Sequence, residues 1–174
     1  MINMAQIQIK FKAVQLSKLV NIKQLYSDNQ RIQEIIDNHL IPKLQHLRAM
    51  DLADYIFTLY LASREFSIFE ELIPSEETVE TLIEQKNKLY YFKAKYLCRL
   101  LKLRKELKQK YKEKADRVEE IAFEIAPRLA NLRRHMLTDY LFTVTLTCRE
   151  FAEFCQLVPS EEEVKKIFTA PLEE

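Results

Sequence analysis

Histidine and cysteine are the residue types here best suited to metal or nucleophilic chemistry, and the sequence has three of each. His39, His46 and His135 stand in neither an HExxH motif nor a Glu-x-x-His pair, the patterns that place two metal ligands on one helix face. Cys148 and Cys155 lie on what the pattern predicts to be one helix, about 10 Å apart and too far for a disulfide. We therefore expect no catalytic site, no metal site and no cofactor.

Charged residues within strongly apolar segments form a second candidate set. The set occurs twice, as Asp54, Arg64 and Glu65 and again as Asp139, Arg149 and Glu150. Asp54 and Arg64 are nearly three helical turns apart, so they cannot meet within one helix. Since no nucleophile or base accompanies them, we expect a structural role in which each set pairs with the other across an interface between repeats.

Glycine is absent from the sequence. Phosphate-binding loops, dinucleotide-binding fingerprints and nucleophile elbows need glycine where the backbone turns tightly, so none can be built here in its usual form. The chain has 174 residues, of which 48% are apolar and 30% charged, as in one soluble globular domain. The cysteines form no even framework, and no stretch resembles a leader or a membrane span. We therefore expect a cytoplasmic protein with no membrane partner and no small-molecule substrate.

The strongest pattern is an internal repeat with a period of 85 residues. Segments 42–79 and 127–164 align without a gap and are identical at 20 of 38 positions, including the run Pro-Ser-Glu-Glu that begins at Pro74 and at Pro159. The period is longer than a solenoid unit and there are two copies, so a tandem duplication forming a pseudo-twofold bundle is favoured over an open array.

Each copy has the periodicity of helices, which predicts an all-α fold. A capping box at Ser27 starts a helix at about 28, and Pro42 ends or kinks it. A buried helix follows over 43–71. Ser75 and Ser160 cap the next helices, of which the first is long, 76–113, while its counterpart stops near Thr169. We expect a single domain, 1–174, made of an N-terminal extension, 1–27, a first repeat, 28–112, and a second repeat, 113–174, with a truncated last helix.

The N-terminal extension has two interpretations. Apolar and polar residues alternate from Gln6 to Ala13, which is the period of a half-buried strand. The following leucines suggest a short helix. A lone strand has no partner within the chain, so residues 6–14 either pair with another chain or join the helical array.

Positive charge is concentrated between Lys86 and Arg117. This stretch contains 13 basic residues and three acidic ones, although the net charge of the whole chain is +1. In a helix, leucine and aromatic residues of this stretch fall on one stripe. The cations on or near the opposite side extend over about 36 Å and are Lys88, Lys95, Arg99, Lys102, Lys105, Lys108 and Lys112.

A row of cations suits the backbone of a nucleic acid, because each neutralised phosphate releases counterions whatever the base sequence. Three alternatives remain: an acidic surface on a protein partner or on a second copy of this chain, an anionic membrane or calmodulin-like receptor, and a plain solvated face. We expect a non-catalytic subunit of a larger nucleoprotein complex that binds nucleic-acid backbone. The alternative is a helical adaptor or chaperone whose basic helix docks an acidic partner.

In size, helicity and basic face, the chain resembles the small helical subunits of CRISPR surveillance complexes. That resemblance implies that the basic helix follows a displaced or guide-paired strand. It also implies that the acidic remainder packs on neighbouring subunits of a ribonucleoprotein.

Overall fold

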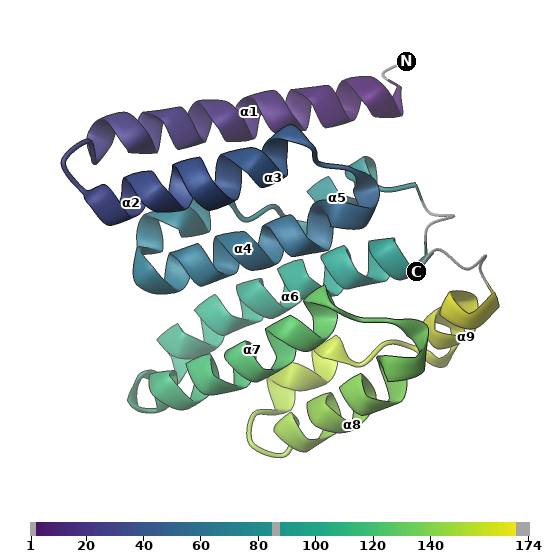
Figure 1. Cartoon of the computed structure of the whole chain (residues 1–174). Helices are drawn as coiled ribbons and strands as arrows, with labels where there is room; N and C mark the ends of the chain where they lie inside the picture. Colours follow the sequence, from purple (N-terminus) through teal and green to yellow (C-terminus); the bar gives the residue numbers. More distant parts are fainter. Residues whose placement is uncertain (1–2, 85–87, 170–174) are drawn as a thin grey trace.

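The computed structural model describes residues 3–84 and 88–169 (Figure 1). Within these residues every regular element is helical, so the all-α prediction is confirmed. The α-helices are α1 (Met4–Leu25), α2 (Gln30–Ile35), α3 (Ile41–Gln45), α4 (Leu52–Glu65), α5 (Glu76–Leu82), α6 (Lys88–Lys110), α7 (Ala115–Ala130), α8 (Leu137–Thr147) and α9 (Glu161–Thr169). Two 3-10 helices, η3 (Ser67–Leu72) and η6 (Ala152–Leu157), precede α5 and α9, and single 3-10 turns occupy Ala49–Asp51, Lys112–Lys114 and Arg134–Met136.

The helix ends form without glycine. No residue in 3–84 or 88–169 has a positive φ, so no helix there ends in the left-handed conformation that glycine usually supplies. The helix starts at Ser75 and Ser160 are confirmed: Ser75 Oγ accepts from the Thr78 N–H at 3.2 Å, and Ser160 Oγ from the Glu163 N–H at 3.1 Å. Glu163 Oε1 accepts in turn from the Ser160 N–H at 3.3 Å, which completes the capping box.

Residues 6–14 lie in α1, so the strand interpretation is wrong. Ile7 and Phe11 pack on the core and Leu19 is buried, at helical spacing, while Ile9 is exposed. Gln15 is buried in the same row, where its amide nitrogen donates to the Leu72 carbonyl at 3.0 Å and its oxygen accepts from the Tyr55 hydroxyl at 2.7 Å. The buried row of α1 thus follows helical spacing and includes a polar side chain whose hydrogen bonds are satisfied inside the core.

Pro42 does not end its helix, so that part of the prediction is wrong. The chain is helical from Gln30 to Gln45, with a π-helical turn, Ile36–Leu40, immediately before the proline. Such a turn is one way to accommodate a missing N–H and a bulky ring inside a helix. Asn29, not Ser27, caps this helix, since its side chain accepts from the Ile32 N–H at 3.1 Å.

The predicted long helix over 76–113 is also wrong, because α5 ends at Leu82 and α6 begins at Lys88. The helix predicted over 43–71 is likewise divided into the end of α3, then α4 and η3. These corrections remove the predicted inequality between the copies. Pairs of elements now begin 85 residues apart: α4 and α8, η3 and η6, and α5 and α9. Likewise α1 and α6 end 85 residues apart, at Leu25 and Lys110.

The recurring order of helices thus begins at α1 and at α6, which differs from the expected repeat starts at 28 and 113. We call residues 3–84 the first half and 88–169 the second half. Lys86 and Pro171 lie outside the described residues.

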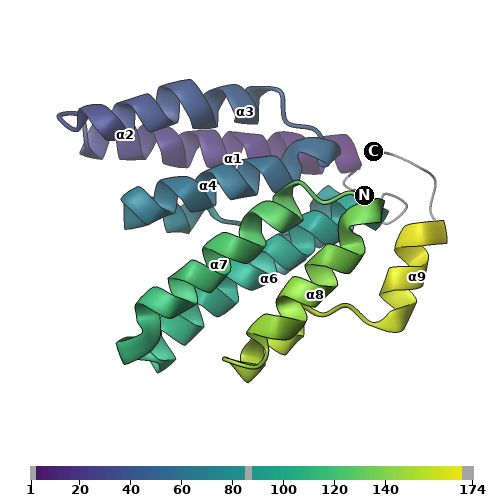
Figure 2. The same cartoon turned by 60° about the horizontal axis from the view of Figure 1, so that its bottom comes forward.

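The two halves meet through unlike surfaces. Helices α4 and α5 of the first half pack on α6 and α7 of the second, and one continuous core runs through both. A twofold axis would bring like surfaces together, so this contact differs from the expected pseudo-twofold arrangement. The surfaces that correspond to the two sides of the junction, α8–α9 and α1–α2, lie at opposite ends of the molecule (Figures 1 and 2). The helices therefore form an open row.

Candidate binding surfaces

Helix α6 is the central helix of the row rather than a helix with one solvated side. Its leucine and aromatic stripe is buried as expected, but so are Ala94, Leu97, Leu101 and Arg104 on other sides. This is because α4 and α5 cover α6 from the first half while α7, η6 and α9 cover it from the second. The solvated basic face is consequently narrower than the sequence indicates.

Four of the seven predicted cations are half-buried: Lys88, Lys95, Arg99 and Lys108. Arg99 binds the Glu76 carboxylate at 2.9 Å and the Gln156 carbonyl at 2.9 Å. Lys108 lies 3.0 Å from Glu119, and the Lys95 ammonium lies 5.4 Å from the centre of the Tyr91 ring. These partners reduce the charge that α6 offers to a ligand.

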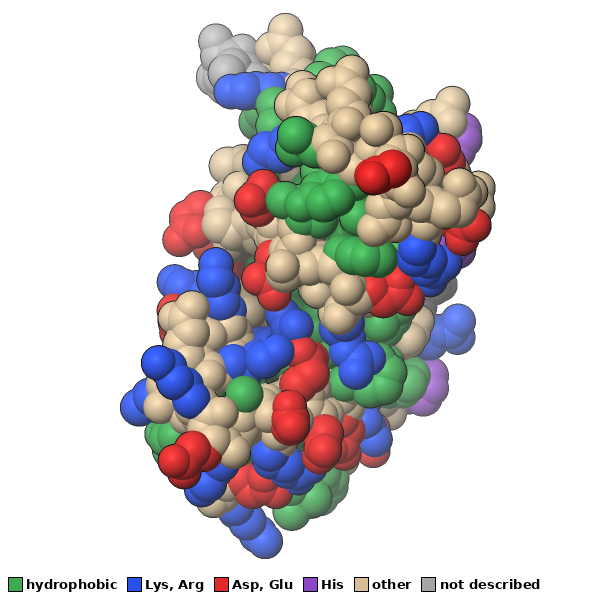
Figure 3. Space-filling model, turned by 90° about the vertical axis from the view of Figure 1, so that its left-hand side faces the viewer, with side chains coloured by type: hydrophobic (Ala, Val, Ile, Leu, Met, Phe, Trp, Pro, Cys, Tyr) green, Lys and Arg blue, Asp and Glu red, His purple; other side chains and the backbone are tan. Residues whose placement is uncertain are grey.

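The other three predicted cations, Lys102, Lys105 and Lys112, are exposed, and none forms an ion pair with a described residue. On the side of the molecule seen in Figure 3, basic side chains alternate with acidic ones rather than forming one continuous stripe. We refer to the three exposed cations Lys102, Lys105 and Lys112 together as the basic patch, of which Lys102 and Lys105 line a hollow that also contains Glu70, Glu76 and Glu77.

An ion-pair network joins the halves at Glu119 of α7. Arg104, which is only 4% exposed, places one guanidinium nitrogen 2.6 Å from Glu119 and another 3.0 Å from Glu70. The Tyr60 hydroxyl donates to Glu119 at 2.7 Å. The sequence did not reveal these residues because their partners are far apart along the chain. The one available signal was the cation Arg104 among the leucines of α6.

The network also controls the protonation of Glu119. Burial by itself raises the pKa of this carboxyl, but the hydrogen bonds from Arg104, Tyr60 and Lys108 outweigh that effect and lower the pKa to about 2. Glu119 is therefore ionised throughout the physiological range and holds the buried Arg104 charge in place.

The two charged sets do not pair with each other, so the expected arrangement is wrong for most of their members. Within the first half, Asp54 pairs with Lys43 at 2.6 Å and Glu65 with Arg31 at 2.9 Å. The second half repeats the pattern, with Arg128–Asp139 at 3.2 Å and Arg117–Glu150 at 2.6 Å. In the first half these ion pairs join α2 and α3 to α4. In the second half they join α7 to α8 and to the turn that follows α8. Their recurrence is explained by local packing within each half.

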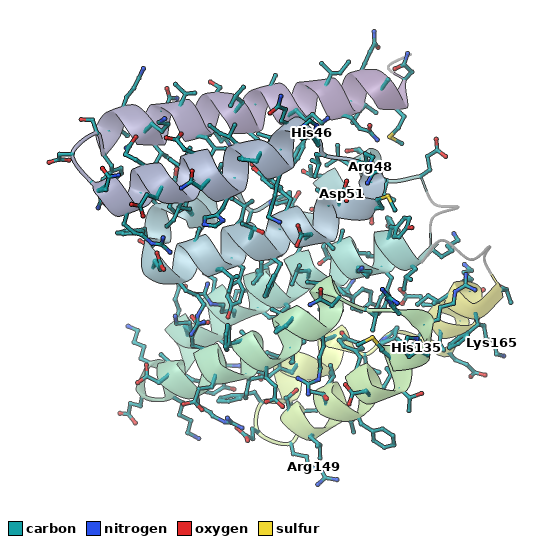
Figure 4. The ribbon with its side chains drawn as sticks, viewed as in Figure 1. His46, Arg48, Asp51, His135, Arg149 and Lys165 are labelled. Atoms are coloured by element: carbon teal, nitrogen blue, oxygen red, sulfur yellow. The ribbon has the colours of Figure 1, made fainter. Side chains whose placement is uncertain are left out.

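Arg64 alone of these residues reaches across the junction between the halves. Its guanidinium lies 3.7 Å from Glu119 and 4.0 Å from the centre of the Phe123 ring. Arg149 occupies the corresponding position in the second half, yet it is exposed and makes no ion pair with a described residue. Figure 4 shows Arg149 extending away from the rest of the molecule.

The histidines are separated: His46 follows α3 and His135 precedes α8 (Figure 4), while His39 lies in the π-helical turn. In the described part of the chain, no three His, Cys, Asp or Glu side chains are grouped closely enough to hold a metal ion.

Cys148 and Cys155 do not share one helix as predicted, because α8 ends at Thr147 and Cys155 lies in η6, and both thiols are free. Burial, reinforced by Cys155, raises the pKa of Cys148 to about 12. Cys148 is therefore a protonated thiol and a weak nucleophile at neutral pH.

The end of the row formed by α8 and α9 exposes large apolar side chains, a surface that we call the C-terminal face. Phe142 is 68% exposed and Phe168 is 53% exposed, and Leu146 and Val158 are exposed as well. Ile83 corresponds to Phe168 in the first half and is 1% exposed. This position is thus buried in the first half and exposed in the second.

None of the described helices is long and apolar enough to cross a lipid bilayer. The geometry defines an all-α protein of stacked helices with an open apolar end. No protein-family model, curated protein or solved structure matches this chain significantly.

Proposed function

We propose that this protein is a non-catalytic helical scaffold in the cytoplasm and that a helical surface of another protein packs on its C-terminal face. The observation that carries the proposal is the exposure of Phe168 and Phe142, whose counterparts in the first half are the buried Ile83 and the half-buried Phe57. Exposed apolar clusters of this kind mark interaction surfaces.

The cover over the first half indicates the chemistry of the partner. There, α4 and α5 are covered by the helices α6 and α7, which present buried leucines, Phe123 and the Glu119 carboxylate. The C-terminal face offers the same kinds of groups as α4 and α5, namely apolar residues and an arginine, Arg149 in place of Arg64. A suitable partner is therefore a pair of helices whose apolar stripe packs on the exposed apolar side chains and which places one carboxylate opposite Arg149. We also propose that the recurrence of the helices reflects a tandem duplication of one scaffold unit.

Site-specific photocrosslinking in cells tests the scaffold. A benzoylphenylalanine at position 142 is expected to form adducts with a protein. The same probe at Leu25, which is 75% exposed but lies on α1, is the matched control. No protein adduct at position 142, or equal adducts at both positions, would contradict the proposal.

A second function, binding of nucleic-acid backbone within a nucleoprotein complex, is favoured by one observation. The basic patch is exposed and free of ion pairs with described residues, as a phosphate-binding surface requires. Its three lysines suit a weak, sequence-independent contact with either DNA or RNA.

Fluorescence anisotropy with single-stranded and duplex DNA and RNA at low salt tests this function. Changing Lys102, Lys105 and Lys112 to Gln is expected to weaken binding and to make the salt slope shallower by up to about one unit per lysine. A triple Gln variant of other exposed lysines, Lys10, Lys18 and Lys166, is the control. Equal losses in both variants, or no affinity in the wild type, would contradict it.

A further inference from the structure

Inside the chain, the junction between the halves shows what covers an α4–α5 surface. That cover is the α6–α7 pair, and the 85-residue correspondence assigns α1 and α2 as its equivalent in the first half. The α8–α9 surface at one end of the molecule therefore corresponds to the α4–α5 side of the internal junction. The α1–α2 surface at the other end corresponds to its α6–α7 side.

The N-terminal end is open at the corresponding positions. Ala94 and Leu101 of α6 are buried under the first half, whereas their counterparts Ile9 and Leu16 are 66% and 43% exposed. Val20 is also exposed and corresponds to Lys105, which lines the hollow between α6 and α5 together with Leu101. We call Ile9, Leu16, Val20 and Glu34 the N-terminal face.

Charge at the two faces is complementary. Across the internal junction Arg64 faces Glu119 at 3.7 Å. The residues 85 positions away from this pair are Arg149 on the C-terminal face and Glu34 on the N-terminal face. Among the described residues, Glu34 pairs with Arg31 alone, at 3.7 Å, so it can accept a second cation. Copies placed head to tail would bring Arg149 of one against Glu34 of the next.

We propose that the protein associates head to tail, with the C-terminal face of one copy on the N-terminal face of the next copy. The proposal rests on the scaffold function above and names its partner as a second copy of this chain. The two faces differ and lie at opposite ends, so the contact is heterologous and leads to rings or filaments rather than to a closed dimer.

Sedimentation velocity over a concentration series tests the assembly. Wild-type protein is expected to grow beyond two copies as concentration rises. An N-terminal-face variant, Leu16→Glu with Val20→Glu, and a C-terminal-face variant, Phe142→Glu with Phe168→Glu, are each expected to weaken association by about tenfold or more. All four side chains are exposed, so thermal unfolding is expected to remain near the wild type. Leu25→Glu, at an exposed position outside both faces, is expected to assemble normally.

Mixing the two face variants gives the sharpest test. Each retains the face that the other has lost, so an equimolar mixture is expected to form a complex of two copies and to stop there. Exchange of the charges is the second test: Arg149→Glu is expected to weaken assembly, and adding Glu34→Arg in the same chain is expected to restore it.

A wild-type protein that stays monomeric, or stops at two copies, would overturn the proposal. So would a mixture of face variants that does not associate. A monomeric wild type whose position 142 still crosslinks to a different protein would overturn self-association alone and leave the scaffold function standing.

Discussion

Glu119 is the residue at which the two halves are most strongly joined. Its carboxylate accepts hydrogen bonds from Arg104, Lys108 and Tyr60, and the Arg64 guanidinium lies 3.7 Å away. Because Arg104 is buried, its charge needs a carboxylate nearby, and removing one partner from such a cluster is more destabilising than replacing the whole cluster by apolar groups.

Glu119→Gln is expected to lower the free energy of unfolding by about 3 kcal/mol at neutral pH, since the buried Arg104 then loses one of its two carboxylate partners. Urea denaturation followed by circular dichroism measures this change. Glu120→Gln on the same helix is the control, since that side chain is 67% exposed and its pair with Arg117 contributes little. Equal effects of the two substitutions would contradict the importance of the network.

The same carboxyl predicts a pH dependence. Its pKa is about 2 in the folded chain against an ordinary value of 4.5. A depressed pKa stabilises the fold above the ordinary value, and this stabilisation is lost as pH falls from about 4.5 towards 2. The wild type is therefore expected to lose more stability than Glu119→Gln over that interval. Denaturation series at pH 6, 4 and 3 measure the difference, and parallel curves would contradict it.

At the scale of elements, the serine caps decide where the last helix of each half begins. Ser160 and Glu163 each satisfy the other's backbone N–H, and Glu163 also accepts from the Tyr96 hydroxyl at 3.0 Å. The cap therefore positions a carboxylate that ties α9 to α6.

Ser160→Ala is expected to destabilise the fold by about 1 kcal/mol, because the Glu163 N–H loses its acceptor. This corresponds to a fall of about 2 to 4 °C in the midpoint of thermal unfolding for a chain of this size. Differential scanning calorimetry measures it. Ser17→Ala, at an exposed position within α1, is the matched control and is expected to leave the midpoint unchanged. A similar fall in both variants would show that the cap has no special role.

At the scale of the whole molecule, the row of helices has a protected centre and open ends. Helix α6 is covered from both halves, whereas among the residues of α9, all of which the structure describes, Ile167 alone is buried. Local opening is easiest where few buried contacts hold an element.

Hydrogen–deuterium exchange is therefore expected to be slowest in α6 and much faster in α9 at dilute protein concentration. Mass spectrometry of peptides from the two helices measures this contrast. Protection of α9 that increases with protein concentration is expected from head-to-tail assembly. Protection of α9 equal to that of α6 at the lowest concentration would contradict the open row.

The sequence by itself determined the helical character of the chain and the helix starts at Ser75 and Ser160. Those features depend on residues a few positions apart: the spacing of apolar side chains, and a serine followed by an acceptor or donor three residues later. It also identified the buried stripe of α6, because every leucine in that stripe faces the same side of one helix.

Tertiary structure alone decided which other sides of α6 are covered and where its cations find partners. Arg99 fits a solvated basic face in the sequence, and only the fold brings Glu76 of α5 against it. The partners of Arg104, which are Glu70 and Glu119, likewise come from other elements of the fold. The break between α5 and α6, the helical state of residues 6–14 and the unlike contact between the halves have the same cause. Each of these features depends on contacts between residues far apart in the sequence, where burial of apolar area and of charge outweighs local preferences. The spacing of apolar residues along the sequence carries information on local structure alone.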